Sequence, residues 1–375
     1  MSGGVVHVVG NRPHFPKLAA VLRAQSQTLS ARTQIIDTGQ HYDRSLSGVF
    51  FEDLGLPEPV ASLGIGSGTA AEQTGRMLIA LEATYTRLKP ALVVVYGDTH
   101  STLAGALAAA QQGLPCVHVE AGLRTFDRSL PEEINRVLVD HLCVRLYAPT
   151  VTAQAQLERE GLADRTELTG DLLVEATLHA RAQTDTPTRL LASLGLSSEA
   201  YGVLTLHRAA NTLPSRLSAL LPALIDTAAR LNRLVWPLHP RTGAALAALE
   251  GDWPTRLAET GIELIEPLGP YEMLDLLANA SLILTDSGGL QKEAFLLGTP
   301  CITLRDQTEW IETLTAGANR LAHDAASLRA ALATHLAQPP DRAALRDQAL
   351  VVYGGGQAGG RIAASLEKLL TESAR

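Results

Sequence analysis

The segment His118–Arg136, HVEAGLRTFDRSLPEEINR, places acidic and basic side chains directly after an apolar run. It contains the carboxylates Glu120, Asp127, Glu132 and Glu133 and the guanidinium groups Arg124, Arg128 and Arg136. The apolar run, Leu114–Val119, is expected to be a buried strand, and open α/β sheets bind ligands beyond the carboxyl ends of such strands. Arginines and partial burial can tune carboxylates there for proton transfer. The alternative is a surface loop followed by an ordinary helix that starts at Pro131.

Two further strand-like runs in the first half end in polar residues. Gly97-Asp98-Thr99 follow the valine-rich run Ala91–Tyr96, and Asp98 is either an acid/base group at the sheet edge or a helix cap. Gly10-Asn11-Arg12-Pro13 follow Val5–Val9, with Lys17 about one turn further on. Arg12 and Lys17 would strengthen an anion site at a helix N-terminus, unless they are solvated bases of a plain turn. The three-glycine spacing of a dinucleotide-binding turn is missing.

The second half contains the strongest anion-binding signal, TDSGGLQKE at Thr285–Glu293. Ser287, Gly288 and Gly289 lead from an apolar run into a helix, where exposed amides and a hydroxyl can hold a diphosphate. Glu293 lies about one turn further on and could accept hydrogen bonds from a ribose. A tight turn with Asp286 as the helix cap is the alternative. Earlier, His207-Arg208 end another run and could meet a phosphate, unless His207 is a hydrogen-bonded core residue.

Apolar runs of strand length alternate with helical patterns along the whole chain. The runs are Val5–Val9, Gln34–Asp37, Ala91–Tyr96, Leu114–Val119, Arg145–Ala148, Gly202–Leu206, Leu234–Leu238, Ile262–Ile265, Leu282–Leu284 and Cys301–Leu304. Strands that are nearly all apolar and alternate with helices predict parallel sheets covered on both faces. We therefore predict an α/β protein with two doubly wound domains, residues 1–171 and 172–356, and a linker near Asp171–Ala200.

Composition narrows the class of protein. The chain has 375 residues, 46% of them hydrophobic, and a formal net charge of -8, which argues against nucleic acid as a partner. We expect no signal peptide and no membrane span, because no apolar run is long enough to cross a bilayer. The spacing of Cys116, Cys143 and Cys301 favours buried free thiols in a cytoplasmic protein. The histidines show no metal-binding pattern, so we predict no metal.

Taken together, these motifs resemble the non-hydrolysing UDP-N-acetylglucosamine 2-epimerase family. The matching segments are GNRP with Lys17, TGQHYD (Thr38–Asp43), YGDTHSTLAGALAAA (Tyr96–Ala110), HVEAGLRTFDRSLPEEINR, LHR, TDSGGLQKE and YGGGQAGGRI (Tyr353–Ile362). The resemblance implies two Rossmann-like domains in a glycosyltransferase-B-like fold, with the site in the cleft between them. It also implies a C-terminal helix, about residues 357–375, that packs on the first domain, and a homodimer.

The family reaction implied by this resemblance needs no cofactor. UDP leaves C1 as the C2 proton is removed, and UDP adds back to the resulting 2-acetamidoglucal after protonation of the opposite face. Motifs and resemblance together predict catalytic roles for Asp98, Glu120, Glu132 and His207. They predict substrate binding by Arg12, Lys17, Arg124, Arg136, Arg208, His239, Ser287, Gly288, Gly289 and Glu293.

Several segments depart from the usual family pattern. The departures are Ala209-Ala210-Asn211 after the LHR motif, Thr308–Glu312 (TEWIE), Val351–Gly356 (VVYGGG) and a short loop between Glu120 and Glu132. The short loop resembles the branch that includes enzymes for UDP-2,3-diacetamido-2,3-dideoxyuronic acids. Competing interpretations are a hydrolysing epimerase that releases N-acetylmannosamine and UDP, a retaining glycosyltransferase, and a UDP-sugar-binding module without catalysis.

Overall fold

The chain passes between two structural units twice. The computed structural model describes residues 3–11, 13–39, 51, 54–183 and 189–372. Unit 1 consists of Met1–Ala176 and Val352–Arg375, and unit 2 of Thr177–Val351. The predicted boundaries, 171/172 and 356/357, fall within a few residues of these. The first crossing lies inside helix α8 (Leu172–Gln183), where we expected a linker, and the second at the end of α18 (Arg342–Val352).

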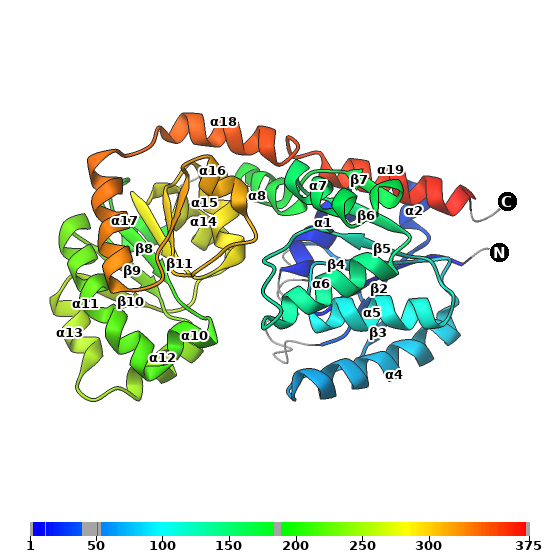
Figure 1. The fold of residues 1–375 in the computed structure, drawn as a ribbon, viewed down its shortest axis with the longest axis horizontal. Coiled ribbons are helices and arrows are strands. Elements are labelled where there is room, and N and C mark those ends of the chain that lie inside the picture. Colours follow the sequence, from blue (N-terminus) through cyan, green and yellow to red (C-terminus); the bar gives the residue numbers. More distant parts are fainter. Residues whose placement is uncertain (1–2, 12, 40–50, 52–53, 184–188, 373–375) are drawn as a thin grey trace. The chain divides into compact units, whose positions relative to one another are not determined.

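Unit 1 is built on a seven-stranded parallel sheet in the order β3-β2-β1-β4-β5-β6-β7 (Figure 1). Its strands are β1 (Val5–Val9), β2 (Thr33–Asp37), β3 (Ala61–Ser62), β4 (Leu92–Tyr96), β5 (Cys116–Val119), β6 (Arg145–Ala148) and β7 (Thr166–Leu168). The chain winds outward in opposite directions from β1 and β4. The carboxyl ends of these two strands therefore form the topological switch point where such sheets bind ligands.

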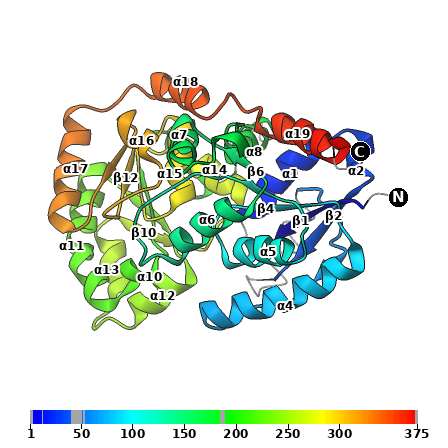
Figure 2. The same cartoon turned by 45° about the vertical axis from the view of Figure 1, so that its right-hand side comes forward.

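Helices cover both faces of this sheet (Figures 1 and 2). They are α1 (His14–Ala24), α2 (Gln27–Ser30), α4 (Ala70–Leu88), α5 (His100–Gln111), α6 (Pro131–Leu142), α7 (Val151–Arg159), the short 3-10 helix η1 (Ala163–Arg165) and α19 (Ala358–Glu372). Val5 and Val9 pack in one core with α1 and α19, whereas Val8 and Val95 face α5. This alternation along fully buried strands explains their continuous apolar sequences.

Unit 2 repeats the design with a six-stranded parallel sheet in the order β10-β9-β8-β11-β12-β13. Its strands are β8 (Gly202–Thr205), β9 (Leu234–Pro237), β10 (Ile262–Ile265), β11 (Leu282–Thr285), β12 (Cys301–Thr303) and β13 (Asn319–Leu321). Its remaining helices are α9 (Arg189–Ser193), α10 (Ala209–Thr212), α11 (Pro214–Leu231), α12 (Pro240–Ala247), α13 (Trp253–Glu259), α14 (Pro270–Asn279), α15 (Gly288–Leu297), α16 (Ile311–Thr315) and α17 (Ala325–Ala337). Here the switch point lies between β8 and β11.

The predicted α/β class with two parallel sheets is confirmed, and all ten predicted strands are present within two residues of their expected ends. Three short strands, β3, β7 and β13, have no counterpart in the prediction. The three cysteines are buried free thiols, as expected. Within the described part of the chain, no helix is long and apolar enough to cross a bilayer.

Candidate functional site

In unit 1, Asp98 and Glu120 lie at the same edge of the sheet, after the carboxyl ends of β4 and β5. Strands β4 and β5 pair with Tyr96 beside Val119, so the residues that follow them emerge side by side. Gly97 turns the chain with a φ of 64°, and a Cβ on it would lie 3.5 Å from Glu120 Oε2 and 3.9 Å from Lys17 Nζ. A glycine is therefore favoured at this turn by its left-handed conformation, whereas the space around it would admit a Cβ.

Lys17 and Glu120 form a nearly buried ion pair. The Lys17 ammonium donates to Glu120 Oε2, and the two side chains are 8% and 11% exposed. Glu120 adopts a φ of 71°, which is uncommon for residues other than glycine, and its amide donates to the Tyr147 carbonyl at 3.1 Å. Strained backbone of this kind clusters at functional sites. The structure thus places a predicted substrate-binding lysine on a predicted catalytic carboxylate.

Asp98 pairs with Arg136 of α6. Arg136 Nη2 donates to Asp98 Oδ2, while its Nη1 lies 3.2 Å from Glu133 Oε2. Asn135 adds a bond from its amide to the Asp98 carbonyl at 2.9 Å. The N-cap of α5 is Thr99, whose hydroxyl accepts from the Thr102 amide, so the interpretation of Asp98 as a simple helix cap is wrong. The Asp98 carboxylate is left 30% exposed beside a fixed cation.

The two adjacent glutamates of α6 have different environments. The helix begins at Pro131, as predicted, and Glu132 in its first turn is exposed. Glu133 is 2% exposed and accepts hydrogen bonds from the Thr125 amide and hydroxyl and from the Phe126 amide, at 2.9–3.0 Å. Glu133 therefore fixes the loop before α6, whereas Glu132 presents a solvated carboxylate.

Arg124, a predicted binding residue of unit 1, does not join this group. The Arg124 guanidinium binds both oxygens of Glu160, at 2.7–2.8 Å, and Asp140 Oδ2 at 2.8 Å. The nitrogens of Arg124 therefore donate to carboxylates of the protein itself. Arg12 lies outside the described residues.

In unit 2, Asp286 organises the residues at the switch point. Its buried carboxylate accepts hydrogen bonds from the His207 and Arg208 amides at 3.0–3.2 Å and lies 3.1 Å from His207 Nδ1. Burial by itself raises the pKa of Asp286, but the hydrogen bond and charge of His207, with the Arg208 amide, hold that pKa below its usual range. The His207 side chain is 40% exposed, so its interpretation as a core histidine is wrong.

The Ser-Gly-Gly turn forms the start of α15. Ser287 is the N-cap and accepts from the Leu290 amide, so the cap is Ser287 and not Asp286. Gly288 and Gly289 are half-buried, and a Cβ on Gly288 would lie 2.6 Å from Glu309 Oε1. The helix N-terminus therefore keeps amides close to the surface, as an anion site requires. Glu293 follows on the same helix, and burial raises its pKa to about 7, opposed by the charge of Lys292.

His239 lies beside His207, with ring centroids 5.8 Å apart. It is exposed and caps α12, accepting from the Arg241 amide at 3.1 Å through Nδ1. Arg241 in turn donates to the His207 carbonyl at 2.9 Å. The ends of β8 and β9 thus present two imidazoles, and Arg208 directly follows His207 in sequence.

Sequence reasoning did not include several residues that shape these sites among the predicted catalytic or binding residues. They are His118, Glu133, Asn135, Asp140, Asn211 and Asp286. Glu133, Arg136 and Asp140 have a spacing of three and four residues, which places them on one helix face, so their pattern was a usable signal. Asn211 donates to Asp286 Oδ2 at 3.1 Å and to the Leu304 carbonyl at 2.9 Å, a pairing with no signal in the sequence.

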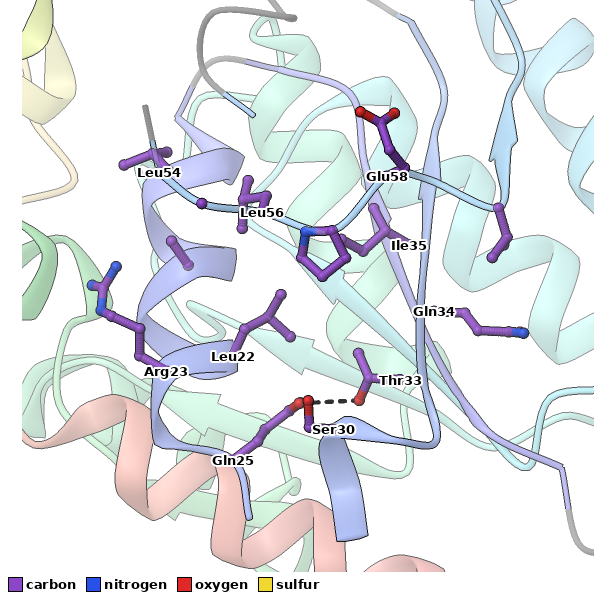
Figure 3. Close-up of a pocket in the computed structure, with 14 residues that line it drawn as sticks. Leu22, Arg23, Gln25, Ser30, Thr33, Gln34, Ile35, Leu54, Leu56 and Glu58 are labelled. Carbon is purple, nitrogen blue, oxygen red and sulfur yellow. Dashed lines mark hydrogen bonds between the residues drawn. The ribbon is translucent and has the colours of Figure 1, made fainter. Parts of the chain in front are cut away.

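A pocket of about 260 Å³ lies elsewhere, on unit 1 between α1, β2 and residues 54–60 (Figure 3). Its polar side chains include Gln25 and Thr33, which bond to each other at 3.1 Å. None of the predicted site residues lines it, so we place no chemistry there. Among the described residues, His, Cys, Asp and Glu side chains form no group of three that could hold a metal ion.

Comparison with known proteins identifies the family. The family model for UDP-N-acetylglucosamine 2-epimerase matches residues 23–367. A UDP-2,3-diacetamido-2,3-dideoxy-D-glucuronate 2-epimerase of Pseudomonas aeruginosa is 42% identical over 373 residues, 97% of this chain and 99% of that protein. A UDP-N-acetylglucosamine 2-epimerase of Methanocaldococcus jannaschii is 43% identical over 322 residues, 84% and 87% of the two chains.

Solved structures agree with these relatives. The crystal structure of the Methanocaldococcus jannaschii UDP-GlcNAc 2-epimerase in complex with UDP-GlcNAc and UDP superposes with a TM-score of 0.87, at 39% identity, covering 97% of this chain and 99% of that one. The match spans both units and includes the motifs that carry the carboxylates. With the extent of the family model, it shows that this chain belongs to the UDP-N-acetylglucosamine 2-epimerase family.

Proposed function

We propose that this protein inverts C2 of a UDP-2-acetamido sugar by eliminating UDP and adding it back. The observation that carries the proposal is the pair of carboxylates at neighbouring strand ends, Asp98 and Glu120, each with its own cation, Arg136 and Lys17. Inversion through a planar intermediate needs acid/base groups for two faces of one carbon, and two carboxylates with separate partners can meet that need.

The proposed reaction balances without an external reagent. A carboxylate takes the C2 proton, the electrons of the C–H bond form the C1–C2 double bond, and the C1–O bond breaks to release UDP. The products held by the enzyme are UDP and a 2-acetamidoglucal. In the second half, a protonated group delivers a proton to the other face of C2 as a UDP oxygen bonds to C1.

Unit 2 is proposed to hold the nucleotide. The start of α15 at Ser287, Gly288 and Gly289 would bind the diphosphate through its amides, and Glu293 would accept from the ribose. His207 and Arg208, fixed by Asp286, would stabilise the charge that develops on departing UDP. The proposal includes no cofactor.

The first candidate substrate is UDP-N-acetylglucosamine, which the reaction would convert to UDP-N-acetylmannosamine. A second candidate is UDP-2,3-diacetamido-2,3-dideoxyglucuronic acid, favoured by the nearly full-length match to the Pseudomonas aeruginosa enzyme. The test is to incubate purified protein with each sugar and follow the products by proton and phosphorus NMR. We expect a C2 epimer still linked to UDP. Free N-acetylmannosamine with UDP would instead identify a hydrolysing enzyme, and binding of both sugars without turnover would identify a binding module.

We further propose a cytoplasmic homodimer. Support for the cytoplasm is the presence of three buried free thiols. Support for association is the exposure of apolar side chains on and before α6, namely Phe126 at 70%, Ile134 at 42% and Leu138 at 47%. Light scattering coupled to gel filtration should give twice the chain mass, and a monomer at micromolar concentration would contradict the dimer.

A further inference from the structure

A buried histidine on β5 connects two segments that carry proposed catalytic groups. His118 is fully buried, and its two ring nitrogens each lie 2.7 Å from an oxygen. Nδ1 faces Asp140 Oδ1 of α6, and Nε2 faces the carbonyl of Gly97. A carbonyl only accepts, so Nε2 carries a proton. The Gly97 carbonyl belongs to the peptide that leads directly into Asp98.

The other oxygen of Asp140 reaches the segment after Glu120. Asp140 Oδ2 accepts from the Gly122 amide at 3.1 Å and lies 2.8 Å from Arg124 Nη1. Arg124 is in turn held by Glu160, so the Asp140 carboxylate has a fixed position. His118 and Asp140 thus connect the peptide before Asp98 with the backbone two residues after Glu120, across neighbouring strands.

The charge state of this pair supports a strong, directed connection. Burial raises the pKa of Asp140, but the hydrogen bond and charge of His118, together with Arg124, hold that pKa below its usual range. An ionised Asp140 is a charged acceptor, and such charge-assisted bonds are shorter and stronger than neutral ones. A buried polar network destabilises the protein unless every donor and acceptor in it has a hydrogen-bond partner. Each ring nitrogen of His118 and each carboxylate oxygen of Asp140 has one.

We propose that His118 and Asp140 are positioning residues that fix the spacing between Asp98 and Glu120 for proton transfer. This inference rests on the proposed function, because it gives the two carboxylates their catalytic task. Neither His118 nor Asp140 is placed to touch the sugar. The pair acts through the backbone on both sides, and a displacement of about 1 Å in such groups can cost about 100-fold in rate.

The test compares three variants with wild-type protein. Asp140→Ala removes the connection. Asp140→Asn keeps its geometry, because the amide can donate to an unprotonated Nδ1 while its oxygen still accepts from Gly122 and Arg124. His118→Gln keeps a polar side chain but cannot bond both Gly97 and Asp140. Asp164→Ala, at an exposed aspartate of unit 1, is the matched control.

We measure kcat, KM, UDP affinity and thermal unfolding on material shown to be folded. Asp140→Ala and His118→Gln should lower kcat by about 100-fold while KM and UDP affinity change by less than about threefold. Asp140→Asn should stay within about fivefold of wild type, and Asp164→Ala should match it. If the pair only stabilised the fold through its charge, Asp140→Asn would lose as much kcat as Asp140→Ala. A retained kcat in Asp140→Asn therefore distinguishes positioning from stabilisation.

Several outcomes would overturn the proposal. These are wild-type kcat in folded Asp140→Ala, a kcat loss accompanied by an equal loss of UDP affinity, or failure of both Asp140→Ala and His118→Gln to fold. The last two would assign the pair to general stability. Wild-type protein that turns over neither UDP sugar would contradict the proposed function itself, which separates that failure from a failure of the positioning pair.

Discussion

The Lys17 ammonium and the Glu120 carboxylate form an ion pair in which both side chains are about nine-tenths buried. Lys17 comes from α1, after the first strand of the sheet, and Glu120 follows β5, so the pair joins segments 103 residues apart. A lysine in this position places a positive charge directly beside the proposed catalytic carboxylate. This arrangement leads to the first prediction.

Replacing Lys17 by methionine should lower kcat by about 100-fold or more, because Glu120 would lose its cation while it stays shielded from water. The free energy of unfolding should fall by about 1–3 kcal/mol for the same reason. Steady-state kinetics and chemical denaturation measure the two effects. Lys368→Met, at a lysine 73% exposed on α19, is the control and should change neither. Full activity in Lys17→Met would contradict the role of the pair.

Arg136→Lys should lower kcat by about tenfold to 100-fold although it conserves charge. Arg136 uses two nitrogens to bind Asp98 and Glu133 at once, and a single ammonium cannot reproduce that planar fork. Arg329→Lys, at an exposed pair with Asp226 in unit 2, is the matched control. If Arg136→Lys has wild-type kinetics, then the position of Asp98 does not depend on this fork.

Asp286→Asn should weaken UDP binding by about tenfold, which corresponds to about 1.4 kcal/mol. The substitution removes an ionised acceptor that orders the His207 and Arg208 amides and the His207 ring. Isothermal calorimetry with UDP measures the loss, and Asp226→Asn at an exposed site is the control. Unchanged UDP affinity would show that the end of β8 does not contact the nucleotide.

We expect the stability of the protein to depend on pH near neutrality because of Glu293. Its pKa is raised to about 7 by burial, so folded protein holds a proton that the unfolded chain releases near the usual value of 4.5. Stability therefore falls as pH rises from about 4.5 to 7, by roughly 3 kcal/mol at most. Glu293→Gln should remove this decline and unfold at higher temperature than wild type at pH 8, with the difference vanishing near pH 4.5.

The same titration should appear in nucleotide binding. In the proposed ribose contact, the ionised Glu293 carboxylate accepts hydrogen bonds from the ribose hydroxyls. UDP affinity of wild-type protein should therefore rise between pH 6 and 8, and that rise should be absent in Glu293→Gln. A flat affinity profile in wild type would contradict the proposed ribose contact. A parallel rise in both proteins would assign the titration to another group.

Ten of the strands could be predicted because they are mostly apolar and are followed by polar turns. Val5–Val9 and Arg145–Ala148 match their predicted bounds. Strands β3, β7 and β13 could not be predicted, since they have two or three residues, lie at or next to sheet edges and lack a long apolar run. Helix α8 occupies a segment that we interpreted as linker, because a helix that crosses between units has no single apolar face to reveal it.

The sequence could predict that the candidate site residues follow strand ends, but it could not predict which side chains pair with each other. Topology alone brings Asp98 beside Glu120, whereas the choice of Arg136 as the partner of Asp98 depends on how α6 is rotated about its axis. That rotation also decides which of Glu132 and Glu133 faces inward, and two adjacent glutamates give no local signal for it. His118 was hidden for a different reason, because its partner Asp140 lies 22 residues away on another element.

The most direct test of the central claim is proton NMR of the wild-type reaction in heavy water, starting from UDP-N-acetylglucosamine and, in parallel, its diacetamido uronic acid counterpart. Elimination and re-addition predict a UDP-linked C2 epimer that carries deuterium at C2, because the proton taken from one face is replaced from solvent on the other. An epimer that keeps its original hydrogen at C2 would contradict this account.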